Sequence, residues 1–180
     1  MSKTIDDLRH EHEAILFTLG LLGKMRALAE AGKALDADDA LALIAFLKEF
    51  ADKCHHGKEE GILFPALERA GIANEGGPIG AMLREHELGR GHIRDMEAAL
   101  RKEPADPAAF ARAADAYARL LSRHIEKENE VLFPMGERAL GEKALDDIYG
   151  RFEEHEERVI GAGRHEELHA LLGEFERKYR

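Results

Sequence analysis

A histidine followed four residues later by a glutamate occurs twice in this chain, each time shortly before the tripeptide Leu-Phe-Pro. The first copy is His56-x-x-x-Glu60 and the second is His124-x-x-x-Glu128. Aligned in this way, one of the two copies carries one extra residue before its Leu-Phe-Pro. A Glu-His-Glu triplet precedes each copy, with its histidine at His12 or at His86. The pattern predicts two helical hairpins of the same design.

The spacing of each pair constrains where the side chains point. Positions four apart on an α-helix differ by about 40° around the axis, so each histidine and its glutamate share one face. Leu63 and Val131 follow the two histidines by seven residues, which makes this the apolar face. Buried carboxylates need compensating cations. We therefore predict a metal site in the core, with these ligands: His12, His56, Glu60, His86, His124 and Glu128.

The expected depths of these residues in the fold agree with one another. His12 and His86 each lie roughly eight residues after an expected helix start, and Glu60 and Glu128 lie roughly ten or eleven residues before an expected helix end. In an antiparallel bundle these starts and ends are neighbours, so both sets lie about 12 to 17 Å from the same end. The six ligands can therefore meet at one level.

The composition favours helices throughout. Hydrophobic residues make up 44% and charged residues 34% of the 180 residues, which is typical of amphipathic helices in water. We expect an all-α fold, an antiparallel up-down-up-down four-helix bundle over residues 1–141, with a helical extension over residues 142–180 packed on it. The expected long helices cover about residues 4–31, 36–71, 79–103 and 107–140, and the shorter ones 142–160 and 164–179. The prolines inside the second and fourth helices predict a kink or bulge.

Charge and cysteine content exclude several classes of protein. A net charge of -10 without a basic cluster argues against nucleic acid as a partner. Neither a secretory signal nor a membrane-length apolar segment is evident, so we expect a cytoplasmic protein without a membrane partner. Cys54 is the single cysteine, which rules out an internal disulfide and predicts a small buried hydrophobe.

Imidazole and carboxylate ligands without thiolate suit iron, manganese or zinc. The ligand order, with Leu-Phe-Pro after each pair, resembles the hemerythrin-like, or HHE, family over about residues 4–140. The resemblance implies a non-haem di-iron centre of four histidines and two glutamates, bridged by Glu60, Glu128 and an oxygen species, with manganese or zinc as less favoured metals. It implies a small ligand, namely dioxygen, peroxide or nitric oxide.

Two departures from the oxygen carriers of that family bear on function. Where the carriers have a further histidine, this chain has Arg90, and their last carboxylate is an aspartate at a spacing of five rather than Glu128 at four. Fewer protein ligands leave open positions, which favours reaction, for example peroxide disproportionation or reaction with nitric oxide, over carriage. Three alternatives stay open: an oxygen or redox sensor or store without turnover, an iron donor for repair of iron–sulfur clusters, and a structural zinc bundle.

Other titratable residues receive lesser roles. Tyr117 lies on the face of His124 and is expected either to hydrogen-bond to a ligand of the metal or to be a plain core residue. Surface positions are predicted for His10, His55, His92, Glu59 and Glu126. His165 and His169 lie four apart and could hold a metal, but packing or capping is favoured for them. His155 stands in a third Glu-His-Glu triplet without a following His-x-x-x-Glu, and its role stays open.

Overall fold

The computed structural model describes residues 2–161 and 164–179, and within them every regular element is helical. The first long helix is α1 (Lys3–Glu30). A continuous helical run follows, made of α2 (Ala37–Phe46), η1 (Leu47–His56), η2 (Glu59–Leu63) and α3 (Phe64–Arg69). Next come α4 (Pro78–Arg101) and a second continuous run of α5 (Pro107–Lys127), η3 (Glu128–Leu132) and α6 (Phe133–Ala139). The chain ends with α7 (Glu142–Val159) and α8 (Arg164–Lys178). The all-α prediction is confirmed.

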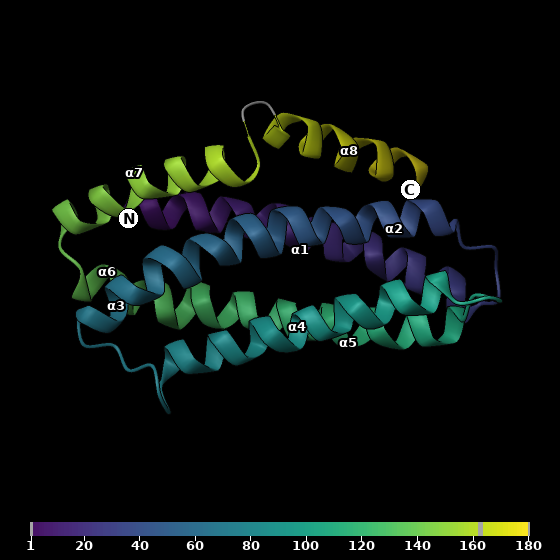
Figure 1. Cartoon of the computed structure of the whole chain (residues 1–180), viewed down its shortest axis with the longest axis horizontal. Helices are drawn as coiled ribbons and strands as arrows, with labels where there is room; N and C mark the ends of the chain where they lie inside the picture. The colour runs from purple at the N-terminus through teal and green to yellow at the C-terminus, as the bar shows by residue number, and fades with distance from the viewer. Residues whose placement is uncertain (1, 162–163, 180) are drawn as a thin grey trace.

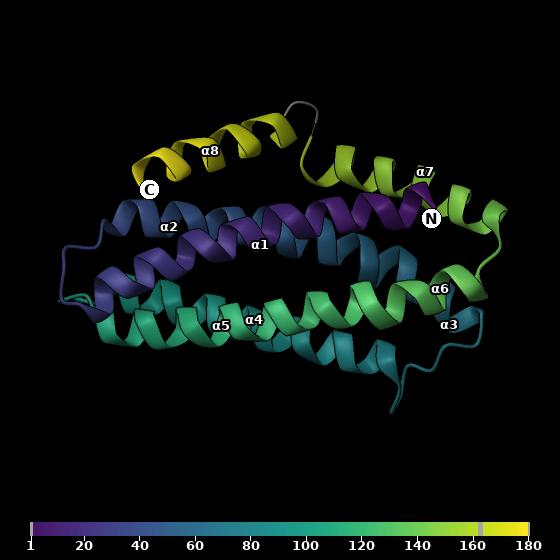
Figure 2. The same cartoon turned by 180° about the vertical axis from the view of Figure 1, so that it is seen from behind.

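The long helical runs lie side by side along the long axis of the molecule (Figure 1). α5 packs against both α1 and α4, while α2 and η1 contact α1 and α4 on the other side. α7 lies on α1 and on η1 and η2, and α8 also contacts α1. Both C-terminal helices therefore cover one side, and α4 with α5 forms the opposite side (Figure 2).

The start of α1 packs against the C-terminal extension. Ser2 is the N-cap of α1, and its side-chain oxygen accepts a hydrogen bond from the backbone N–H of Ile5. Thr4 is buried and donates its hydroxyl to the backbone carbonyl of Leu145 on α7. The first turn of the chain is thus tied to the C-terminal extension.

The bulges predicted near the two Leu-Phe-Pro segments are present as widened turns of π-helix. Each turn ends at the leucine of its segment. In η2 the backbone N–H of Phe64 donates to the carbonyl of Glu59, and in η3 that of Phe133 donates to Glu128, five residues back in each case. A proline has no N–H of its own, so it tolerates this local change in the ladder. The same π-helical turn therefore begins at equivalent glutamates, Glu59 and Glu128, in the two halves of the chain.

The apolar core is divided into two clusters, with the polar residues between them. One cluster contains Leu22, Leu43 and Phe110 in the half of the molecule where α2 begins. The other contains Leu8, Leu63, Phe133 and Phe152, at the end where α3 and α6 lie. Within the described residues, no helix is both long and apolar enough to cross a membrane.

The packing of α7 leads to a stability prediction. Phe152 is fully buried against the second cluster, so Phe152→Ala should lower the free energy of unfolding by about 3–5 kcal/mol. Leu88→Ala, at a side chain that is 57% exposed, should change it by less than about 0.5 kcal/mol. Urea unfolding followed by circular dichroism measures both, and similar values for the two variants would show that α7 does not belong to the cooperative core.

Candidate metal centre

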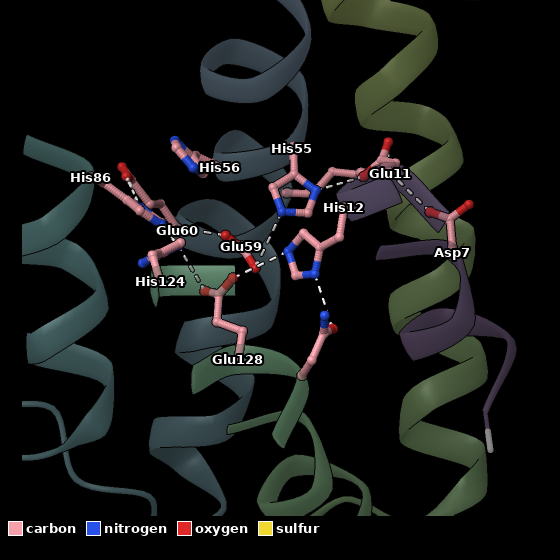
Figure 3. Close-up of polar contacts among 12 residues, drawn as sticks. Asp7, Glu11, His12, His55, His56, Glu59, Glu60, His86, His124 and Glu128 are labelled. Atoms are coloured by element: carbon pink, nitrogen blue, oxygen red, sulfur yellow. Dashed lines mark hydrogen bonds and ion pairs between the residues drawn. The ribbon is translucent and has the colours of Figure 1, made fainter. Parts of the chain in front are cut away.

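A layer of seven buried polar side chains crosses the interior between the two apolar clusters. α1 contributes His12, α4 contributes His86, and the two continuous runs contribute the rest (Figure 3). The seven residues are His12, His55, His56, Glu59, His86, His124 and Glu128. Their ligand atoms form two groups in which all atoms lie within 4.8 Å of one another, close enough to hold a metal ion. His12, His55, Glu59 and Glu128 make up one group, and His56, Glu59, His86 and His124 make up the other.

The two carboxylates lie in the middle and face imidazole nitrogens from both halves of the chain. Glu128 lies 3.2 Å from Nε2 of His12 and 3.2 Å from Nε2 of His124. Glu59 lies 3.7 Å from Nε2 of His55 and 3.4 Å from Nε2 of His86. Each carboxylate therefore connects one histidine from the first half to one from the second (Figure 3). Glu59 belongs to both groups, whereas Glu128 belongs to one group and reaches His124 of the other.

The other ring nitrogen of each histidine, Nδ1, is held by a residue outside the layer. This bond fixes the orientation of the ring and directs Nε2 inward. The pairs are His12 with Asn129 (3.0 Å), His55 with Glu11 (2.8 Å), His56 with Asp52 (3.4 Å), His86 with Glu60 (2.7 Å) and His124 with Glu85 (3.0 Å).

The inward-facing atoms approach one another as ion pairs, but several of them form no hydrogen bond in the described part of the chain. These atoms are Nε2 of His12, His55 and His56 and both carboxylate oxygens of Glu59 and Glu128. In addition, Nε2 of His86 and Nε2 of His124 face each other at 3.1 Å. Buried polar atoms without partners are costly, and imidazole nitrogens with carboxylate oxygens are a suitable donor set for a divalent metal. The residues present therefore fit a metal centre.

The electrostatics of the layer point the same way. Burial, together with the neighbouring charge of Glu128, raises the pKa of Glu59 well above its ordinary value. Burial lowers the pKa of His55 and of His56. Burial also opposes the charge on His124, but the Glu128 carboxylate outweighs it and raises the pKa of His124 to about 9. Without a metal, Glu59 therefore favours its neutral form and Glu128 pairs with a protonated His124. A bound cation would take the place of these protons.

Two predictions about the glutamates of the second helical run are wrong. Glu60 does not point into the core: its side chain is 30% exposed, donor groups of His86 and Arg90 hold it at 2.7 Å each, and it approaches the layer only from outside. Glu59, which we predicted to lie on the surface, is fully buried in the centre. The neighbouring residue thus takes the place predicted for Glu60.

The surface position predicted for His55 is also wrong, since its ring is fully buried. The error came from the alignment of the repeat. His55 to Pro65 and His124 to Pro134 align without any insertion, and this pairs His55 with His124 and Glu59 with Glu128. That ungapped alignment was the sequence signal that could have identified His55 and Glu59 as residues of the buried layer. His56 then corresponds to Ile125 and is an additional buried histidine.

A cavity of about 180 Å³ opens beside His56 and His86. Gly89, Ile93 and Tyr117 form its walls, and the charged groups around it are Lys48, Asp52, Arg90 and Arg94. Arg90 donates to Asp52 at 2.8 Å and to Glu60 at 2.7 Å, so it is held beside the layer and takes no place within it. Tyr117 is buried along this cavity, and burial raises its pKa, which keeps the hydroxyl protonated.

The remaining candidates lie outside the layer. His10 and Glu126 are exposed, as predicted, while His92 is half-buried on α4. His155 donates from Nε2 to the backbone carbonyl of Lys53, which is a packing contact. Our predictions for His165 and His169 concern side chains outside the described ones.

Cys54 is buried, as predicted, and its pKa is raised to about 12 by burial. It forms a further cluster with Glu11 and Glu156. The ammonium of Lys58 lies 2.7 Å from Glu11 and 3.8 Å from Glu156 and already compensates these carboxylates. This cluster therefore needs no metal.

Comparison with known proteins identifies the family. No curated protein and no solved structure matches the chain. The family described as the hemerythrin HHE cation binding domain matches residues 3–136, which include all seven residues of the buried layer and most of the two continuous helical runs. The chain belongs to the hemerythrin HHE cation-binding family.

Proposed function

We propose that the protein is a non-haem di-iron protein that reacts with peroxide, nitric oxide or dioxygen. One iron is held by His12 and His55 and the other by His56, His86 and His124. Glu59 and Glu128 bridge the two ions within an antiparallel up-down-up-down bundle. The observation that carries this proposal is the set of inward-facing imidazole and carboxylate atoms that form no hydrogen bond with any described residue.

His56 takes over a role that the family's oxygen carriers give to the third long helix. Its ring stacks on His86 with the centroids 3.8 Å apart, and its Nε2 is one of the unpartnered atoms. Arg90, at the position of the carriers' additional histidine, is engaged by Asp52 and Glu60 instead. We infer that a third imidazole reaches the second ion from the second helical run.

The cavity beside His56 and His86 supports reactivity rather than a purely structural metal. It leads from the charged rim to two of the proposed ligands, and it is large enough for a peroxide or diatomic molecule. Iron in the site supplies redox chemistry, while Ile93 and Tyr117 restrict access. Zinc in the same site would bind without redox chemistry, because Zn²⁺ has no accessible second oxidation state.

The experiment that tests this proposal begins with protein made in iron-containing medium. We expect close to two irons per chain. Hydrogen peroxide, nitric oxide and dioxygen are then added in turn while the near-ultraviolet absorption of the iron is followed. Catalytic consumption supports an enzyme, a stable stoichiometric complex supports a sensor or store, and iron release supports a donor. A reproducible content of zinc alone would contradict the proposal.

Two neighbouring glutamates allow a matched test of the bridging ligand. Glu59→Gln should reduce the iron content below about one ion per chain, because a bridging carboxylate contacts both ions and offsets their mutual repulsion. Glu60→Gln should retain most of the iron, because Glu60 only orients His86. Mass spectrometry measures the iron content of both variants. A greater loss of iron in Glu60→Gln than in Glu59→Gln would identify Glu60 as the bridging ligand.

A second variant tests the cavity as the route to the metal. Ile93→Phe should narrow the cavity and slow the reaction with hydrogen peroxide several-fold, because the larger ring extends toward His56 and His86. The iron content should stay unchanged. Leu88→Phe, on the same helix but exposed, is the control. Stopped-flow mixing measures the rates, and equal rates in both variants would mean that peroxide arrives by another path.

A further inference from the structure

The ungapped repeat extends to a lysine that the proposed ligand set does not use. Lys58 directly precedes Glu59, and Lys127 directly precedes Glu128. Upstream, Glu11 precedes His12 and Glu85 precedes His86 in the same manner. Each half of the chain therefore carries one lysine and one glutamate at equivalent positions next to its proposed ligands.

These residues form the same three-membered chain in each half. In the first, the ammonium of Lys58 lies 2.7 Å from Oε1 of Glu11, and Nδ1–H of His55 donates to Oε2 of Glu11 at 2.8 Å. In the second, Lys127 donates to Oε1 of Glu85, and Nδ1–H of His124 donates to Oε2 of Glu85 at 3.0 Å. Each glutamate uses one oxygen for the lysine and the other for the histidine.

We propose that Lys58 and Lys127 are positioning residues for the metal centre, each fixing a proposed histidine ligand through the glutamate between them. The inference rests on the proposed function, because it assigns a role toward the two ions held by His55 and His124. A carboxylate clamped by an ammonium cannot rotate freely, so the imidazole that donates to it keeps Nε2 directed inward.

The two chains differ in burial, and their contributions should differ accordingly. Lys58 is fully buried, with Asp7 at 3.0 Å and the ring of Phe152 on α7 at 5.3 Å. The Lys127 side chain is 43% exposed. Salt screens exposed ion pairs far more than enclosed ones. Lys58 should therefore matter more, and only the effect of Lys127 should depend on ionic strength.

Methionine substitutions test the proposal, because methionine has a similar length and no charge. In full-length protein loaded with zinc, Lys58→Met should weaken the binding of one of the two ions by about 10- to 100-fold. Lys127→Met should weaken the binding of the ion held by His124 by less than about tenfold at low salt. In about 1 M sodium chloride the effect should be smaller still, because salt already screens the ion pair of the parent protein. Competition with a chelator measures these affinities. Lys53→Met, at an exposed lysine of η1, is the control.

A second readout separates positioning from general stability. The Nδ1–H proton of His55 should be resolved in spectra of the zinc-loaded protein labelled with ¹⁵N-histidine. Its exchange with water should accelerate at least tenfold in Lys58→Met and return toward the parent rate in Lys58→Arg. The His124 proton should respond in the same way to Lys127→Met. Because Lys127 is partly exposed, Lys127→Met should fold even if Lys58→Met does not, and it still tests the proposal.

Two results would have different meanings. If the parent protein takes up no metal, the proposed function is wrong. If the parent takes up two ions and both methionine variants keep parental affinities and unchanged Nδ1–H exchange, the positioning role is wrong while the metal centre stands.

Discussion

The structure depends on two carboxylates placed in the middle of an apolar interior. Glu59 and Glu128 are fully buried, and their oxygens face the Nε2 sides of histidines as well as each other. Such an arrangement is unfavourable without a cation. The hydrogen bonds at the outer, Nδ1 side of the rings therefore hold the histidines in place to bind a metal, in addition to stabilising the fold. Asn129, Glu60, Glu11 and Glu85 surround the layer for this reason, and metal binding and folding should be coupled.

Composition and helical spacing predicted the all-α fold, and the long helices begin and end within a few residues of the expected positions. The level of the site was predictable because 1.5 Å per residue is a reliable measure of depth. Rotation around the second helical run was not, because neighbouring His55 and His56, like Glu59 and Glu60, satisfy the same spacing of four. An angle of 100° per residue decides between them only if the helix is regular, and η1 and η2 are not.

The ungapped repeat would have resolved this ambiguity from the sequence, because Phe64-Pro65 and Phe133-Pro134 fix the register of the two copies. His56 would still have remained unrecognised, since its counterpart is the apolar Ile125 and no second copy indicates a ligand there. Its role depends on the approach of η1 to His86 on α4, which is a tertiary feature. The lysine–glutamate contacts also join residues 47 and 42 positions apart, and spacing alone could not reveal them.

Each central carboxylate contacts a histidine from both hairpins, and this has an evolutionary consequence. Two identical copies of a single hairpin, associated about a twofold axis, would build the same pair of positions from one short gene. Duplication and fusion of that gene would join the copies without changing the chemistry, and it would also free each half to diverge. The additional imidazole at His56 and the enclosure of Lys58 by α7 are differences that a symmetric homodimer could not have confined to one side.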